Sequence, residues 1–175
     1  VVLVNLIAFL LDVGLTSRVR LKTGLRAVFV IPMVISGIVI AYVFNFLFSN
    51  SLPAFGAAVG IPWLSESILA NPDLAWVAIV IVSTWQSIPA TLLIYIAGLL
   101  STPGEVYEAA DIDGASALQR FWYVTLPQLG PMIRISVFFS LVGSLQVFDL
   151  IVPLTGGGPL NSTHTMVSYL YQFGV

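Results

Sequence analysis

A short acidic segment is the first place where residue types and spacing predict chemistry. Its acidic residues recur every three positions and are Glu105, Glu108 and Asp111. Its small apolar face consists of Val106, Ala109 and Ala110. Alanine permits close backbone approach, and a neighbouring carboxylate can accept charge-assisted bonds from arginine. The pattern favours a helix that inserts into a groove of another protein over a helix on lipid, which usually carries Lys and Arg.

The flanking residues predict how this segment folds. Residues 102–105 read Thr-Pro-Gly-Glu, which supplies an N-cap at Thr102, a proline at the first helical position and a glutamate three residues after the cap. Gly114 is typical of a helix stop, and Ser116 is a candidate cap for a second short helix that ends ahead of Pro127. We therefore expect two short helices joined by a glycine turn within residues 101–127.

Polar residues inside apolar stretches form a second candidate group, because their burial in hydrocarbon is costly. They are Ser83, Gln86, Ser87, Ser144 and Gln146. Pro89 is expected to kink or loosen the helix that carries the first three. Neutral amides and hydroxyls suit uncharged, hydroxyl-rich solutes, so these residues are candidates for a substrate pathway. Hydrogen bonding between helices explains them equally well.

A glycine-rich turn forms a third candidate site. Residues 155–159 read Thr-Gly-Gly-Gly-Pro, so Gly156, Gly157, Gly158 and Pro159 would let another surface approach closely. An ordinary return loop is an equal alternative. No Gly-Lys-Ser/Thr follows, which argues against a phosphate-binding loop.

Enzyme chemistry has little support in this sequence. The chain has no cysteine and one histidine, His164, which alone cannot build a typical metal site or catalytic triad. We expect no metal, no bound cofactor and no nucleic-acid partner for this chain.

The elements that position these residues are predicted to be membrane helices. The chain is 58% hydrophobic and only 8% charged, with a mean hydropathy of +1.02, which leaves too little polar cover for a soluble globule. Residues 27–48, 74–100 and 128–152 are long enough to span a bilayer, whereas 1–11 and 166–175 are shorter and are interpreted as spans cut by the sequence ends. The predicted fold is all-α, a polytopic transmembrane bundle of five helices.

The distribution of cations predicts the orientation of these helices. Arg18, Arg20, Lys22 and Arg26 lie in the connection 12–26, and Arg120 lies in the connection 101–127. The other two connections, 49–73 and 153–165, contain no cation. By the positive-inside rule, 12–26 and 101–127 are cytoplasmic and the other two face outward.

The acidic segment also carries a family resemblance. Glu108-Ala109-Ala110, three residues, Gly114, nine residues and then Val-Thr-Leu-Pro at 124–127 resemble the EAA signature of ABC importer permeases, with Val124 where isoleucine is most frequent. Further similarity to the sugar-transporting branch extends from about Leu25 to the end of the sequence, including the Thr-Gly-Gly-Gly-Pro turn.

The resemblance implies that 1–175 is a single permease domain, truncated at both ends, and that its EAA loop 101–127 is a coupling element seated in a cleft of an ATP-hydrolysing subunit. The implied coupling residues are Glu108, Ala109, Ala110, Asp113 and Gly114. Glu108 would pair with a cationic or donor group of the ATPase, and Gly114 would permit the bend.

The family further implies two ATPase copies that hold ATP and Mg, a second permease subunit forming a heterodimer, and an extracytoplasmic solute-binding protein. The location implied is the bacterial or archaeal plasma (inner) membrane. The cargo would be a sugar, an oligosaccharide or a polyol, with glycerol phosphate as an alternative. A secondary transporter is a more remote reading, because its coupling would need acids in the middle of the spans, and no Asp, Glu or Lys is present there.

Overall fold

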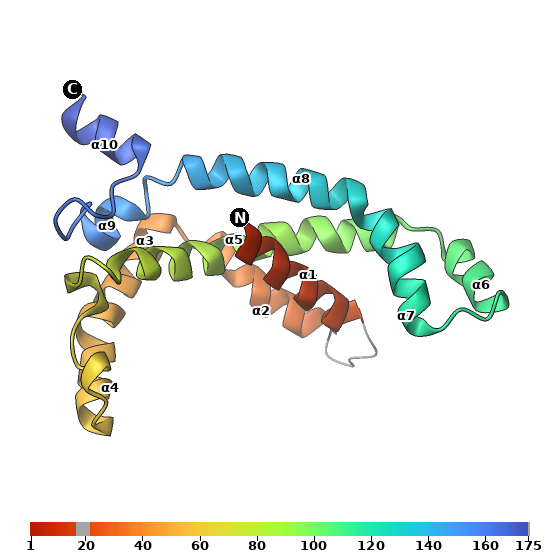
Figure 1. The fold of residues 1–175 in the computed structure, drawn as a ribbon, viewed down its shortest axis with the longest axis horizontal. Helices are drawn as coiled ribbons and strands as arrows, with labels where there is room; N and C mark the ends of the chain where they lie inside the picture. The colour runs from red at the N-terminus through yellow and green to blue at the C-terminus, as the bar shows by residue number, and fades with distance from the viewer. Residues whose placement is uncertain (17–21, 175) are drawn as a thin grey trace. The chain divides into compact units, whose positions relative to one another are not determined.

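The computed structural model describes residues 1–16 and 22–174, and these residues form helices joined by turns, with no strand among them. The all-α prediction is confirmed. Arg18 and Arg20, on which the predicted orientation partly rests, lie outside the described residues. The chain divides into two compact units, Val1–Val30 with Ser87–Leu141 and Ile31–Gln86 with Val142–Val175. The long helices α5 (Ala75–Ser101) and α8 (Leu126–Leu145) each contribute to both units (Figure 1).

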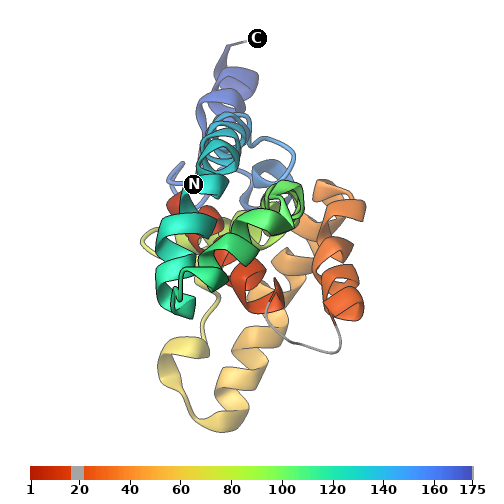
Figure 2. The same cartoon turned by 90° about the vertical axis from the view of Figure 1, so that its right-hand side faces the viewer.

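The first unit packs α1 (Val2–Thr16) against the second half of α5 and most of α8. Its core consists of Ala8, Leu92, Tyr95 and Ile96, with Phe29 and Met132 packed against it. Gly98 permits close approach of α5 and α8, because a methyl group there would lie 2.6 Å from Met132 Cγ. The unit also contains α6 (Gly104–Ile112), α7 (Ala117–Arg120) and the π-helical turn η4 (Phe121–Thr125), which Figure 2 shows from the end of the unit.

The second unit contains α3 (Gly37–Phe46), a π-helical turn η1 (Leu47–Ser51) and α4 (Leu52–Val59). Two short 3-10 turns, η2 (Pro62–Leu64) and η3 (Ile68–Ala70), precede α5, and α9 (Ile151–Thr155) and α10 (Met166–Phe173) follow α8. The core consists of Ile40 and Ala41 of α3, Val82 of α5, and Leu150 and Leu154. These contacts place α9 on α3.

The predicted spans agree with the structure in part. Among the described residues, three helical runs are long and apolar enough to cross a membrane: Gly37–Val59, Ala75–Ser101 and Ala117–Leu145. The predicted span 74–100 matches α5, and Pro89 does not interrupt that helix.

The predicted spans 27–48 and 128–152 have wrong boundaries. Helix α2 (Lys22–Val34) ends before Ser36, whose backbone is extended, and α3 begins at Gly37. Helix α8 ends at Leu145 and α9 begins at Ile151. The described residues form ten α-helices in all, a number that includes the short helices between the predicted spans. The predicted spans followed the longest apolar runs and so passed over single polar residues such as Ser36, Gln146 and Asp149 at the breaks.

The predicted helix–turn–helix of residues 101–127 is confirmed at its centre and corrected at both ends. Gly114 adopts a left-handed backbone with φ +71°, and Ser116 caps the next helix. The N-cap of α6 is Pro103 rather than Thr102, because the Thr102 hydroxyl donates to the Gly98 carbonyl at the end of α5. The second short helix does not end before Pro127, since α7, η4 and α8 are continuous.

A buried polar node joins the three main helices of the first unit. The Asn5 Oδ1 atom of α1 accepts hydrogen bonds from Tyr95 Oη of α5 at 2.8 Å and from the Ser136 hydroxyl of α8. Its Nδ2 atom donates to the Val1 carbonyl at 3.0 Å and to Ser140 Oγ at 3.2 Å. Every hydrogen-bonding position of the Asn5 amide is therefore used. Tyr95 and Ser136 are each 1% exposed, so water cannot replace these contacts.

Replacement of Asn5 by leucine is expected to destabilise the protein. Asn5→Leu keeps the side-chain volume but leaves two buried hydroxyls without their acceptor, which costs about 1–2 kcal/mol. The measurement is the thermal unfolding midpoint of the full-length protein in mild detergent. Asn50→Leu is the matched control, since Asn50 is exposed and makes only a 3.4 Å contact with the Phe46 carbonyl. Equal midpoints for the two variants would contradict the role of the node.

Candidate functional site

The acidic segment lies at the surface of the first unit. Glu108, Ala109, Asp113 and Gly114 are exposed and Ala110 is half-buried. A methyl group on Gly114 would meet no atom within 4 Å, so its left-handed backbone, rather than crowding, is what requires glycine. All five predicted coupling residues thus lie on one helix and turn at the surface of the first unit.

Large apolar side chains are exposed on this turn and on the helical run that follows it. Ile112 is 86% exposed and Tyr123 is 80% exposed, and Leu118 and Trp122 are also exposed. Exposed apolar residues of this size next to a polar rim are typical of a surface that binds another protein. These four residues were not among the predicted site residues, although Ile112 and Leu118 are close to Gly114 in the sequence.

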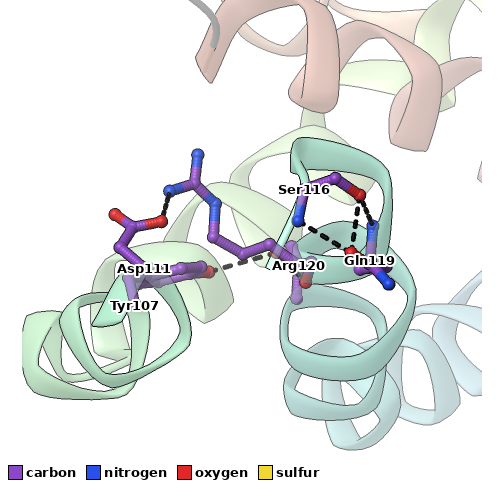
Figure 3. A network of polar contacts seen from close by, with 6 residues as sticks. Tyr107, Asp111, Ser116, Gln119 and Arg120 are labelled. Atoms are coloured by element: carbon purple, nitrogen blue, oxygen red, sulfur yellow. Dashed lines mark hydrogen bonds and ion pairs between the residues drawn. The ribbon is translucent and has the colours of Figure 1, made fainter. Parts of the chain in front are cut away.

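Local hydrogen bonds give the turn a definite shape (Figure 3). Ser116 Oγ accepts from the Gln119 backbone N–H at 3.4 Å, and Gln119 Oε1 accepts from the Ser116 backbone N–H at 2.8 Å. This reciprocal capping box starts α7. Arg120 at the end of α7 pairs with Asp111 at the end of α6, with 2.6 Å between Nη1 and Oδ1.

The predicted pathway residues lie in two places along the chain, on α5 and at the end of α8. Ser83 and Gln86 are half-buried in the second unit, and the Ser83 hydroxyl donates to the Val80 carbonyl within α5. Ser144 and Gln146 belong to the same unit and are exposed, whereas Ser87 belongs to the first unit.

A polar cluster that sequence analysis overlooked lies at the start of α3. A methyl group at Gly37 would lie 2.5 Å from Asp149 Oδ2 and 3.4 Å from Gln86 Nε2, so both side chains lie close to the first residue of the helix. A carboxylate beside a helix N-terminus is electrostatically favourable. The signal in the sequence was Asp149 itself, an acid near the end of the predicted span 128–152.

The glycine-rich turn is an ordered structure held by threonines. Thr163 Oγ1 donates to the Gly158 carbonyl at 2.8 Å and lies 2.9 Å from Thr155 Oγ1. Gly157 is buried with φ +83°, and the His164 ring fills the space that a Cβ at Gly157 would need. Of the four predicted docking residues, Gly156 is exposed and Gly158 and Pro159 are half-buried. His164 therefore shapes the turn, a role that sequence analysis missed.

A buried acid also escaped the sequence analysis. Asp12 was assigned to the connection 12–26, but it lies within α1 and is 0% exposed. No group of three or more metal-ligating side chains occurs among the described residues.

Comparison with known proteins identifies the family. A family described as the inner membrane component of binding-protein-dependent transport systems matches residues 5–175. The chain belongs to this family. It is therefore a membrane protein of the ABC importer permease class, and the resemblance drawn from the EAA segment is confirmed.

Individual relatives of this permease are transport proteins. The chain is 39% identical over 160 residues to the multiple sugar-binding transport system permease protein MsmF of Streptococcus mutans, covering 91% of this chain and 55% of the relative. It is 37% identical over 157 residues to the trehalose/maltose transport system permease protein MalF of Thermococcus litoralis, covering 89% and 53% respectively. The chain thus spans little more than half the length of these relatives.

A solved structure shares the fold. The chain superposes with a TM-score of 0.81 on a crystal structure of a bacterial ABC transporter involved in the import of the acidic polysaccharide alginate. The match covers 96% of this chain and 60% of the other, at 20% sequence identity. The all-helical architecture of the permease is therefore that of a known ABC importer.

Substitution of Gly157 is expected to disturb the glycine-rich turn more than substitution of its neighbour. Gly156 and Gly157 both have positive φ, but only at Gly157 would a methyl group overlap His164. Gly157→Ala should therefore raise amide hydrogen exchange across residues 155–165 well above the level seen with Gly156→Ala. Hydrogen–deuterium exchange of the full-length permease measures this. The same exchange in both variants would show that His164 does not shape the turn.

Proposed function

We propose that the full-length protein is the permease subunit of a binding-protein-dependent ABC importer for a sugar or a related polar solute. The family match over residues 5–175 carries this proposal. The cargo is inferred from relatives named for multiple sugars and for trehalose/maltose transport. Glycerol phosphate is the alternative cargo on the same fold.

The exposed EAA turn supports a coupling role. Glu108, Ala109, Ala110, Asp113 and Gly114 would seat in a cleft of a cytoplasmic ATPase, where Glu108 accepts bonds from a cationic group. The uncovered Ile112 and Tyr123 would be buried in the same contact, which is favourable because apolar area leaves water. ATP and Mg would be held by the ATPase subunits and not by this chain.

The assembly would place these surfaces on opposite sides of a plasma (inner) membrane. Residues 12–26 and 101–127 would face the cytoplasm with two ATPase copies. Gly156, Gly158 and Pro159 would face outward toward a solute-binding protein, with Gly157 and His164 supporting them. A second permease subunit, forming a heterodimer with this chain, would complete the pathway.

The coupling role is tested by valine substitution at two glycines of the same loop. Gly114→Val forces a β-branched residue into a left-handed backbone, whereas Gly104→Val places it at the first residue of α6, where no positive φ is needed and no atom lies within 4 Å. Gly114→Val should lower ATP-driven uptake by about tenfold or more, since the left-handed region costs roughly 1–2 kcal/mol. Gly104→Val should retain most uptake.

The tagged full-length permease would be purified in mild detergent from its native host for this test. A stoichiometric ATPase and a second permease should co-purify with the wild type. A solitary chain that does not respond to ATP would refute the importer proposal. Equal uptake by the two valine variants would refute the coupling role of Gly114 but would leave the importer proposal standing.

The substrate pathway is tested at Gln86. Gln86→Leu removes the amide from the Gly37–Asp149 cluster and should raise the solute concentration for half-maximal uptake several-fold, because a lost polar contact of about 1 kcal/mol is close to a fivefold change. Basal ATP hydrolysis should stay unchanged. Gln128→Leu is the matched control, since Gln128 is exposed near the start of α8. An unaltered half-maximal concentration in Gln86→Leu would remove Gln86 from the pathway.

A further inference from the structure

Apolar packing does little to orient helix α6. No residue of α6, α7 or η4 is buried. The turn η4 is connected to the core of the first unit, because Phe121 stacks on Phe9 with 6.0 Å between ring centroids. Helix α6 has no such aromatic anchor in the described structure, and Gly114 follows it in a turn that only backbone hydrogen bonds close. Polar contacts must therefore set its orientation.

Two side chains of α6 supply these contacts (Figure 3). Tyr107 and Asp111 are four residues apart and so lie on one face of the helix. Asp111 Oδ1 pairs with Arg120 Nη1 at 2.6 Å, and Tyr107 Oη accepts from Thr125 Oγ1 at 3.5 Å. Among the described residues, no other α6 side chain has a hydrogen-bond partner.

The π-helical turn explains why Arg120 and Thr125 can face α6 together. Residues five apart lie on different faces of an α-helix but near one another in a π-helix, whose hydrogen bonds join i and i+5. The Leu126 N–H bonds to the Phe121 carbonyl in this way, and Thr125 Oγ1 lies 3.5 Å from the Arg120 carbonyl. Pro127 has no N–H with which to close an α-type bond to the Tyr123 carbonyl. The wider π-helical turn immediately before Pro127 therefore gives up no such hydrogen bond at that position.

We propose that Arg120 is a positioning residue that, with Thr125, clamps α6 against η4 and sets the angle at which α6 meets its partner subunit. This inference rests on the proposed coupling function. Both ionic groups are partly exposed, at 38% and 57%, so the pair adds little to global stability. It acts instead on the orientation of one short helix, where no competing packing energy has to be overcome.

A double-mutant cycle tests the clamp in the reconstituted full transporter. Asp111→Asn, Arg120→Gln and the double variant are compared by the amount of solute moved per ATP hydrolysed. Each single variant should lower this ratio roughly two- to fivefold, the range of one exposed ion pair, and the double variant should be no worse than either. Arg120→Lys, which keeps the positive charge, should retain most of the solute moved per ATP that Arg120→Gln loses. Glu105→Gln is the control, since it removes one charge from α6 where the described structure shows no ion pair.

A spin label tests the same clamp without the ATPase. The sequence contains no cysteine, so Glu105→Cys places a single label on α6 within these residues. The label should be more mobile in the Asp111→Asn and Arg120→Gln backgrounds than in the otherwise unchanged chain. The clamp would be overturned if the effects of Asp111→Asn and Arg120→Gln on solute moved per ATP were additive in the double variant. It would also be overturned if the spin label were equally mobile in all backgrounds. A wild-type assembly without ATP-driven uptake would instead overturn the proposed function, while the label still reports on the clamp.

Discussion

Each backbone amide in the apolar helices must find its partner inside the protein, because hydrocarbon offers none. The chain satisfies this constraint in helices that continue through prolines, as α5 does at Pro89 and α8 at Pro131. The π-helical turns η1 and η4 absorb local changes in hydrogen bonding without ending the helical run. The same constraint applies to side chains, and the fully bonded amide of Asn5 is its clearest case.

Apolar packing and short polar contacts serve different purposes in this chain. Within each unit, apolar residues hold the long helices, and at Gly98 and Gly37 an added methyl group would meet neighbouring atoms. At the EAA turn and the glycine-rich turn, short polar contacts hold exposed segments in a defined shape. A transporter needs both, since rigid helices can transmit a movement only if the docking segments at their ends have a set orientation.

Local signals in the sequence predicted the parts of the site that depend on local backbone. Gly114 and Ser116 were predicted correctly, because a left-handed turn and a capping box are decided by a few neighbouring residues. The break at Ser36 and the end of α8 at Leu145 were missed, since single polar residues within a long apolar run do not by themselves show where a helix ends. Asp12 was missed for a related reason, as a single acid at the end of an apolar run resembles the start of a loop.

The sequence by itself determined that this is a helical membrane protein of the importer permease family, because composition, run length and the EAA spacing are properties of the chain alone. Only the tertiary structure decided which side chains meet. Arg120 pairs with Asp111, His164 lies against Gly157, and Gln86 and Asp149 each lie close to Gly37. Each pair joins residues that are apart in sequence, and their distance depends on how helices end and pack, which no local pattern specifies.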